Sequence, residues 1–310
     1  MTIASGTNVV VGFKEETTYG SEVAGTDYTI IPFKSASLSL AKTNHESAVI
    51  TGNREVQDVI MGSHSVTGEI SFDLAHQPAY IEMLRGVLGD DALSGGLMTI
   101  GAERQSYTIV QDFGVDLNGG DDAHVYTGCE FNNFSMSIPA DGLVECSVGI
   151  VGATMTTETS GNDTDPDNGG TNYLEANNPF HSSDAVIVEG AANSICTDLS
   201  LSVENGIETT NIVGNEIPIQ GGISKCRVTG SMTCHFTSSA LLEKFIGNTS
   251  SALSITFGSS TTGFKFDLPK IIYTTGAVEV GGEGLLSVSM DFVAVATSPT
   301  VGALTIDTAL

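Results

Sequence analysis

One stretch near the middle of the chain has the residue types of a calcium-binding loop. In the sequence GNDTDPDNGG, Asp163, Asp165 and Asp167 alternate with small residues, and glycines follow. A helix–loop–helix calcium site needs oxygen ligands at its first, third and fifth positions, glycine at the sixth and glutamate at the twelfth. Counted from Asp163, Gly169 and Glu175 each come one residue late. Because acidic clusters with Gly, Asn and Pro are usually turns or linkers, we interpret this stretch as a linker.

The other candidates for chemistry are weaker. His124 lies beside Asp121 and Asp122, which could bind a metal ion, but this set is more typical of a surface loop. The sequence has no Gly-x-Ser-x-Gly, no His-Glu-x-x-His, no phosphate-binding loop and no dinucleotide fingerprint. We therefore predict no catalytic residue, no cofactor site and no metal site, and we expect that the protein is not an enzyme.

The cysteines are odd in number and none forms a Cys-x-x-Cys pair. They are Cys129, Cys146, Cys196, Cys226 and Cys234. Several fall on the apolar side of alternating segments, where free thiols behave as small hydrophobic residues. The N-terminus lacks the basic and apolar regions of a secretion signal, and no window is apolar enough to span a membrane. We therefore expect five reduced core cysteines in a protein assembled in a cytoplasm.

The charge is strongly acidic. The 310 residues include 37 acidic and 11 basic side chains, for a net charge of −26, and no Lys or Arg occurs between residues 105 and 224. Such a surface repels nucleic acid and anionic membranes, which disfavours a protein that grips DNA or binds a membrane. It is compatible with a wall past which a polyanion slides without sticking.

The second half of the chain repeats the first. Four segments recur in the same order at an offset of 161 or 162 residues: 37–40 with 198–201, 50–53 with 212–215, 66–72 with 228–234, and 80–86 with 241–247. A fifth match, 141–143 with 283–285, follows a shorter interval because the insert 117–124 has no counterpart. The acidic stretch described above falls between the two copies, which supports its interpretation as a linker.

Each copy has the pattern of a small β-rich domain with one short helix. Residues from Val66 to Leu74 alternate between apolar and polar types, and so do their counterparts from Cys226 to Phe236. This alternation is typical of antiparallel sheets with one face on a core. Pro78 begins one predicted helix, whose apolar stripe should pack on the sheet, and Gly247 ends the other. The predicted fold class is therefore all-β, with two tandem sandwich or barrel domains and one short helix in each.

The pattern divides the chain into five parts. They are an N-terminal arm (1–32), a first domain (33–155), an acidic Gly/Asp-rich linker (156–185), a second domain (186–297) and a C-terminal tail (298–310) that is either ordered or frayed. Within the domains, the stretches 41–65 and 204–225 are too long for simple hairpin turns. Their mixed apolar and charged content favours ordered contact surfaces.

These segments together resemble a known family. GFKEETTYGSEVAGTDYTIIPFKSASLSL, VTGEISFDL and GCEFNNFSMSIPADGLVECSVGIVG in the first copy are similar to tail tube proteins of tailed bacteriophages. So are VTGSMTCHF, ALLEKFIG and VGGEGLLSVSMDF in the second copy. The resemblance covers nearly the whole chain except the linker and the residues after Val295.

The resemblance implies a structural virion protein. Family members form rings whose sheets join into one continuous β-barrel, and the rings stack into a hollow tail tube. The tube houses the tape-measure protein and conducts DNA during ejection, and it meets tail terminator and tail-tip proteins at its ends. Because this chain carries two copies, a ring of three subunits with pseudo-sixfold symmetry is favoured, although a hexamer is possible. The location implied is the virion tail, after assembly in the cytoplasm of a bacterial host.

Two sets of residues are candidates for roles in such a tube. We expect contacts between stacked rings from the long connections, at Ile50, Arg54, Val56, Val59, Ile60, Ile212, Ile217, Ile219 and Lys225. We expect the polar strand faces to line the lumen, at Glu69, Ser71, Asp73, Glu145, Ser287, Ser289 and Asp291.

Two other structural roles stay open on the sequence. One is a secreted or cell-surface tandem β-sandwich that serves in binding or adhesion, although the lack of Trp and of a secretion signal argues against it. The other is the tube component of a contractile injection system, which would share the logic of β-barrel rings.

Overall fold

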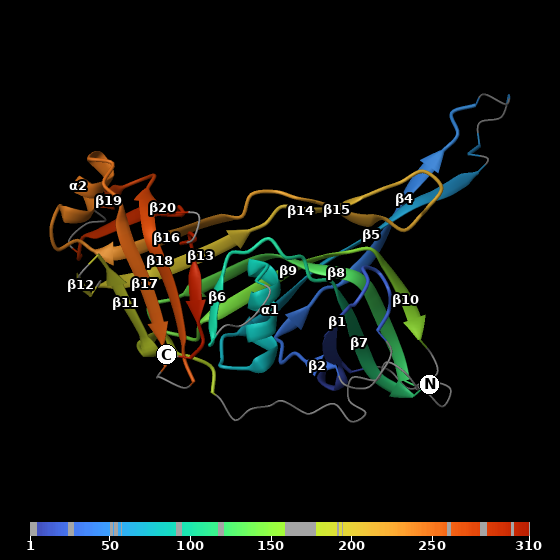
Figure 1. The fold of residues 1–310 in the computed structure, drawn as a ribbon, viewed down its shortest axis with the longest axis horizontal. Helices are drawn as coiled ribbons and strands as arrows, with labels where there is room; N and C mark the ends of the chain where they lie inside the picture. Colours follow the sequence, from blue (N-terminus) through green and yellow to red (C-terminus); the bar gives the residue numbers. More distant parts are fainter. Residues whose placement is uncertain are drawn as a thin grey trace.

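The computed structural model describes most of the chain and confirms the all-β class. The described residues are 5–23, 28–49, 52, 55–56, 58–90, 95–116, 121–158, 178–190, 192–193, 195–258, 262–279, 284–298 and 301–309. Apart from two α-helices and two short 3-10 turns (Gly6–Asn8 and Ser182–Asp184), the regular elements among these residues are strands (Figure 1). The acidic stretch 161–170, which we interpret as a linker, lies outside the described residues.

The first repeat is a sandwich of two sheets that share one long strand. One sheet contains β1 (Val10–Glu15), β2 (Thr29–Ile30), β7 (Tyr107–Asp116) and β10 (Thr154–Glu158). The other contains β3 (Ser35–Ala36), β4 (Ser39–Glu46), β5 (Val59–Asp73) and β9 (Glu145–Gly152). The strand β8 (Asp121–Ile138) belongs to both, because its first part pairs with β7 and β10 and its part from Glu130 onward pairs with β9, across a bulge at Phe131–Asn133. Such a bulge bends a strand, so it can pass from one sheet to the other.

The second repeat follows the same plan. One sheet contains β11 (Ala185–Glu189), β12 (Ala192–Asn193), β17 (Ser251–Phe257) and β18 (Phe264–Tyr273). The other contains β13 (Cys196–Glu204), β16 (Arg227–His235), β20 (Ser287–Ala294) and β19 (Ala277–Glu279). Here β18 and β19 together take the place of the single strand β8.

The two repeats join through their strands into one sheet. Along it, β4 pairs with β5, β5 with β9, β9 with β8, β8 with β13, β13 with β16, β16 with β20 and β20 with β19, every pair antiparallel. The apolar face of this sheet lies on a single core that contains buried residues from both repeats, and the rings of Phe134 and Phe266 stack across it. We call the sheet formed by these strands, from β4 to β19, the eight-stranded sheet.

The repeats match in space at slightly different offsets from those in the sequence. Ser71 pairs with Ser35 in the first repeat, and its counterpart Thr233 pairs with Asp198 in the second. The strand pairing therefore relates 35–38, rather than 37–40, to 198–201. A shift of two residues keeps every side chain on the same sheet face, which is why the Ser-x-Ser-Leu pattern alone did not distinguish the two alignments.

The two helices differ in how far they are buried. Helix α1 (Pro78–Leu88) begins at its proline and ends at Gly89 in the left-handed conformation, as expected for such an end. Its apolar stripe is buried, and the Tyr80 hydroxyl donates to the Pro32 carbonyl at 2.7 Å. Helix α2 (Ala240–Ile246) has no buried residue, and Ile246 is 71% exposed. The expectation that the helices pack on the apolar face of the sheets agrees with both, since Leu241, Leu242 and Phe245 of α2 also pack against the core, although none of them is fully buried.

The segments outside the predicted domains are built into the sheets. The N-terminal residues supply β1, whose Val11 and Phe13 are buried. The C-terminal tail is ordered from Val301 to Ala309 and contains β21 (Thr305–Asp307). This strand pairs with β18 of the second repeat on one side and with β6 (Leu97–Thr99) of the first on the other, so it ties the two repeats together.

One cysteine prediction is corrected. Cys196 and Cys234 face each other across β13 and β16, and they form a disulfide. Cys129 and Cys146 are free and buried, and Cys226 is free and half-buried. The expectation of five reduced thiols is therefore wrong for the first pair, because the pairing of the two strands, which the sequence did not reveal, places their side chains opposite each other.

Candidate assembly surfaces

The outward face of the eight-stranded sheet is polar over its whole width. The side chains that alternate with the core residues are mostly serine, threonine and acidic groups. Serine hydroxyls meet across neighbouring strands at Ser35–Ser71, Ser135–Ser147 and Ser200–Ser231, at 2.7 to 2.8 Å. Hydroxyl pairs of this kind stabilise neighbouring strands and present a neutral polar surface to solvent.

Charged groups sit on this face, and acidic ones outnumber basic ones. The acidic residues on it are Glu69, Asp73, Glu145, Asp198, Glu204 and Asp291, each at an alternating position opposite the core. Lys34 and Arg227 are basic residues at its margin. Lys34 contacts two of the carboxylates, Asp73 at 3.1 Å and Glu145 at 2.6 Å. The hydrogen bonds to Glu145 and Asp73 raise the pKa of Lys34, so this lysine stays charged beside them.

The polar face is hollowed where the two repeats meet. A shallow open depression of about 470 Å³ lies over β5, β8, β9 and β13, and it is lined largely by serines, among them Ser135, Ser137 and Ser202. Its polar side chains are serine hydroxyls and the Lys34–Glu145 ion pair, and the apolar residues Phe72, Met136, Cys146 and Leu201 complete the lining. The depression is therefore a hollow in the outward face of the sheet, at the junction of the two repeats.

The structure places the seven residues expected at a lumen on this one face. They come from β5, β9 and β20: Glu69, Ser71, Asp73, Glu145, Ser287, Ser289 and Asp291. The sequence reasoning missed the central serines of β8 and β13, which lie between them. The alternating segments 133–138 and 198–204 carried that signal.

A second surface is formed by two hairpins that project from the sheet. The first is the extended end of β4 and β5, and the second is β14 (Ile207–Thr210) with β15 (Ile219–Ile223). Both fall in the stretches predicted as long connections, although much of each stretch is strand. The β14–β15 hairpin runs beside β5 (Figure 1), and the His64 amide donates to the Glu216 carbonyl at 2.8 Å. We call these two elements the paired hairpins.

The paired hairpins expose many large apolar side chains. Among the predicted contacts, Val56, Val59, Ile60, Ile212, Ile217 and Ile219 are all exposed, and so is Lys225. Ile50 and Arg54 lie outside the described residues. The hairpins also expose Val49, Met61, Val213 and Ile223, which the sequence reasoning did not single out. A concentration of exposed apolar residues on one part of a molecule is typical of a surface that another protein covers.

A buried ion pair fixes the second hairpin to the first repeat. The Glu130 carboxylate is only 3% exposed and accepts hydrogen bonds from Arg104 Nε at 3.0 Å and from Gln220 at 2.9 Å. Arg104 also donates to the Gly221 carbonyl on β15. Asn205 donates its side-chain amide to the Val87 carbonyl at the end of α1. Groups from both repeats therefore set the position of the β14–β15 hairpin.

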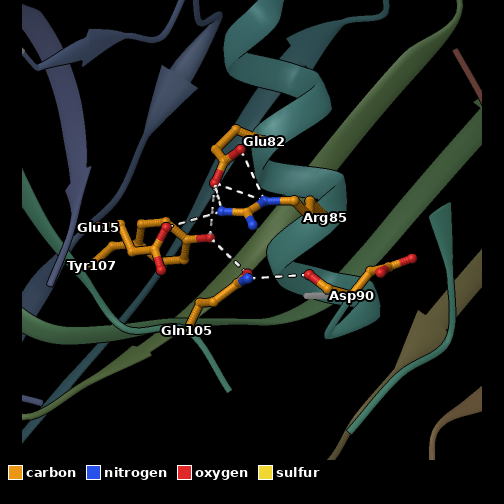
Figure 2. A network of polar contacts seen from close by, with 6 residues as sticks. All are labelled: Glu15, Glu82, Arg85, Asp90, Gln105 and Tyr107. Carbon is orange, nitrogen blue, oxygen red and sulfur yellow. Dashed lines mark hydrogen bonds and ion pairs between the residues drawn. The ribbon is translucent and has the colours of Figure 1, made fainter. Parts of the chain in front are cut away.

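A second polar network holds α1 on the other sheet of the first repeat. Figure 2 shows Arg85 between Glu82 and Glu15, with Tyr107 beside them. Arg85 Nε lies 3.0 Å from Glu82 and one terminal nitrogen lies 2.9 Å from Glu15. Burial opposes the charge, but the hydrogen bond and attraction to Glu82 outweigh it and raise the pKa of Arg85. The network is therefore a permanently charged clamp, which stabilises the helix.

The described residues contain neither a metal-binding cluster nor a membrane-spanning helix. Among the described residues, no three His, Cys, Asp or Glu side chains are grouped so as to hold a metal ion. His124 instead contacts the rings of Phe113 and Tyr126. No helix in the described part of the chain is long and apolar enough to cross a membrane.

Comparison with known families decides what these surfaces belong to. Residues 6–294 match the family model described as phage tail tube protein. The chain belongs to the phage tail tube family. A search of curated proteins gave no match. Tail tube proteins are structural components of the virion tail, and the match spans both repeats, so the duplicated chain as a whole is a tail tube protein.

Proposed function

We propose that this tail tube protein assembles into rings that stack to form the hollow tail tube. The observation that carries the proposal is the eight-stranded sheet, which consists of two equivalent four-stranded halves and ends on each side, among the described residues, in a strand with one unpaired edge. Exposed sheet edges favour association with further strands, and closure into a barrel removes them. Three chains with eight strands each would close a barrel of 24 strands with pseudo-sixfold symmetry.

The polar face of the sheet is the proposed wall of the lumen. Its hydroxyls give a hydrated surface, and the excess of carboxylates over basic groups repels phosphate. DNA would therefore pass without adhering, and the tape-measure protein would occupy the same channel before ejection. The exposed apolar residues of the paired hairpins are the proposed contacts between successive rings, together with Lys225 and Arg54, which would pair with acidic groups of the next ring.

The proposed partners are further copies of this chain, the tape-measure protein, and the terminator and tip proteins at the two ends of the tail. Assembly would take place in the cytoplasm of the bacterial host. Because no catalytic arrangement is needed for any of these roles, the proposal includes no enzymatic activity.

Negative-stain electron microscopy of the purified chain across a concentration series tests the proposal. We expect stacked rings or hollow tubes that become longer and more numerous as the concentration rises. Particles that stay monomeric at all concentrations, including after addition of the tail-tip proteins as an initiator, would contradict it.

A further inference from the structure

The two ends of the eight-stranded sheet are complementary. Among the described strands, β4 pairs only with β5, and β19 pairs only with β20, so each has one unpaired edge. These edges lie at opposite ends of the molecule (Figure 1). Because neighbouring strands of the sheet alternate in direction, β19 and β4 run in opposite directions. The β19 strand of one chain could therefore pair antiparallel with the β4 strand of another.

The chain contains an example of the same junction. Where the two repeats meet, the last sheet strand of the first repeat, β8, pairs with the first strand of the second, β13. The pairing places Ser137 opposite Ser200, Met136 opposite Leu201, and Ser135 opposite Ser202. Because β8 corresponds to β19, and β13 corresponds to β3 and β4, this junction inside the chain is a template for a junction between chains.

The strand pairings fix which residues correspond. On one side, Ser135 of β8 pairs with Ser147 of β9, and Ala277 of β19 pairs with Ser289 of β20. Ser147 and Ser289 are equivalent, because they pair with the counterparts Ser71 and Thr233. The strand β8 therefore maps to β19 with an offset of 142. The bulge in β8 also has a counterpart. The register in which β18 pairs with β20 differs by one residue from the register in which β19 pairs with β20.

On the other side, the first strand of each half is aligned through its pairing with the next strand, β13 with β16 and β3 and β4 with β5. Ser200 pairs with Ser231, and the counterpart of Ser231 in β5 is Glu69, which accepts the amide hydrogen bond of Ser37 at 2.9 Å. The offset between the first strands is therefore 163, as the pairings of Ser35 and Asp198 with β5 and β16 also give.

We infer that β19 of one chain pairs antiparallel with β3 and β4 of a second copy, with Glu279 opposite Ser37, Val278 opposite Leu38, and Ala277 opposite Ser39. The inference rests on the ring assembly proposed above and adds the edges and the register of the subunit interface. The partner at this interface is a second copy of this chain, because the template is a contact that the chain already makes between its own repeats.

The surroundings of these residues agree with the register. The Ser37 amide points to β5, so in an extended strand the amide of Leu38 points to the free edge, where it can bond to Val278. Leu38 is buried and Val278 is half-buried against the core, while Ser39 and Ala277 are exposed with the polar face. The paired strands would therefore continue both the core and the polar face without interruption.

Cysteine cross-linking of the full chain tests the inference. Ser39→Cys and Ala277→Cys place thiols at directly opposite positions of the proposed junction, where Cα atoms lie about 4.5 Å apart in an antiparallel pair without hydrogen bonds. This is within the range of a disulfide. Since Ser39 lies in β4 and Ala277 in β19, the two outermost strands of the eight-stranded sheet, a bond between them must join different chains.

A matched control changes the register by two residues. The double variant Ala41→Cys with Ala277→Cys keeps both thiols exposed on the same face, but places them diagonally, at about 7–8 Å. That pair would be opposite if the offset of 161 from the sequence applied in place of 163. Each single variant controls for cross-links between identical positions.

The outcomes separate the register from ring assembly. After mild oxidation of assembled material, we expect most of the S39C/A277C chains to run as covalent oligomers on non-reducing gels, and at least fivefold fewer of the A41C/A277C chains. Rings in the microscope with cross-linking in the control pair, or in neither pair, would overturn the inference and leave the proposed function intact. Absence of both rings and cross-links would overturn the two together.

Discussion

Removing Arg104 should destabilise the contact between the β14–β15 hairpin and the first repeat. The change Arg104→Met keeps most of the side chain's apolar length but takes away the partner of Glu130, whose carboxylate is 3% exposed. Breaking a buried pair from one side typically costs about 3–5 kcal/mol, because an uncompensated charge stays buried. Gln220 still donates to Glu130 at 2.9 Å, so we expect the lower end of that range, about 3 kcal/mol.

A double variant distinguishes a buried charge from lost packing. With Glu130→Gln added, no charge remains, and the amide can still accept from Gln220. We therefore expect Arg104→Met/Glu130→Gln to cost only about 1 kcal/mol, so that adding Glu130→Gln restores about 2 kcal/mol to the Arg104→Met variant. Lys265→Met is the matched surface control, since Lys265 lies 3.9 Å from Asp267 and their side chains are 39% and 42% exposed, and it should cost under about 0.5 kcal/mol.

Unfolding in denaturant, followed by far-ultraviolet circular dichroism, measures these differences, since the chain has no Trp for fluorescence. The protein is kept at a concentration at which it stays monomeric, because association would add to the apparent stability. A cost below about 1 kcal/mol for Arg104→Met, or a double variant as unstable as the single one, would refute the assignment of a buried, paired charge at this position.

Three further predictions concern other parts of the molecule. Burial opposes ionisation of Glu189, but hydrogen bonds led by that from Lys244 lower its pKa below the usual 4.5, so its stabilisation is present above about pH 4.5 and is lost as the pH falls through the lowered value. The stability difference between the native chain and Glu189→Gln, from denaturant unfolding, should accordingly shrink on acidification, and a constant difference would contradict this. Gly68→Ala should cost about 1–3 kcal/mol by the same assay, because the added Cβ would fall 2.4 Å from the Ser37 carbonyl oxygen, and an unchanged stability would disprove that close approach. Ile60→Asp should leave the thermal unfolding of the monomer unchanged and shorten tubes seen by microscopy, whereas tubes of normal length would exclude a stacking role for this exposed residue.

The sequence predicted those features that depend on local pattern. The period of two along β5, β9, β16 and β20 assigned their polar and apolar faces, and Pro78 marked the start of α1. The repeat predicted two equivalent halves. These signals are strong because one face of a strand must be buried and the other must not.

The sequence could not predict features that depend on contacts between distant segments. Pairing of β21 with β6 joins residues about 200 positions apart, and nothing in the short segment 305–307 specifies that partner. The disulfide between Cys196 and Cys234 depends on the register of β13 with β16. The two-residue difference between sequence and strand alignment of the repeats has the same origin, since alternation is unchanged by an even shift.

The exposure of α2 also depended on something absent from its own sequence. Its apolar stripe has the spacing of a buried helix, and Leu241, Leu242 and Phe245 do contact the core. Helix α1 also contacts β2 and the Pro32 carbonyl in the segment between β1 and β3, and the second repeat has no equally long segment between β11 and β13. A helix pattern therefore predicted an apolar face without indicating how much of it is covered.

A reconstruction of the assembled particle by cryo-electron microscopy tests the central claim most directly. The account predicts rings of three chains with pseudo-sixfold symmetry, in which the polar face of the eight-stranded sheet, including Ser71, Ser147 and Ser289, lines a hollow lumen. Rings in which this face points outward, or in which the sheets of neighbouring chains are not joined, would contradict it.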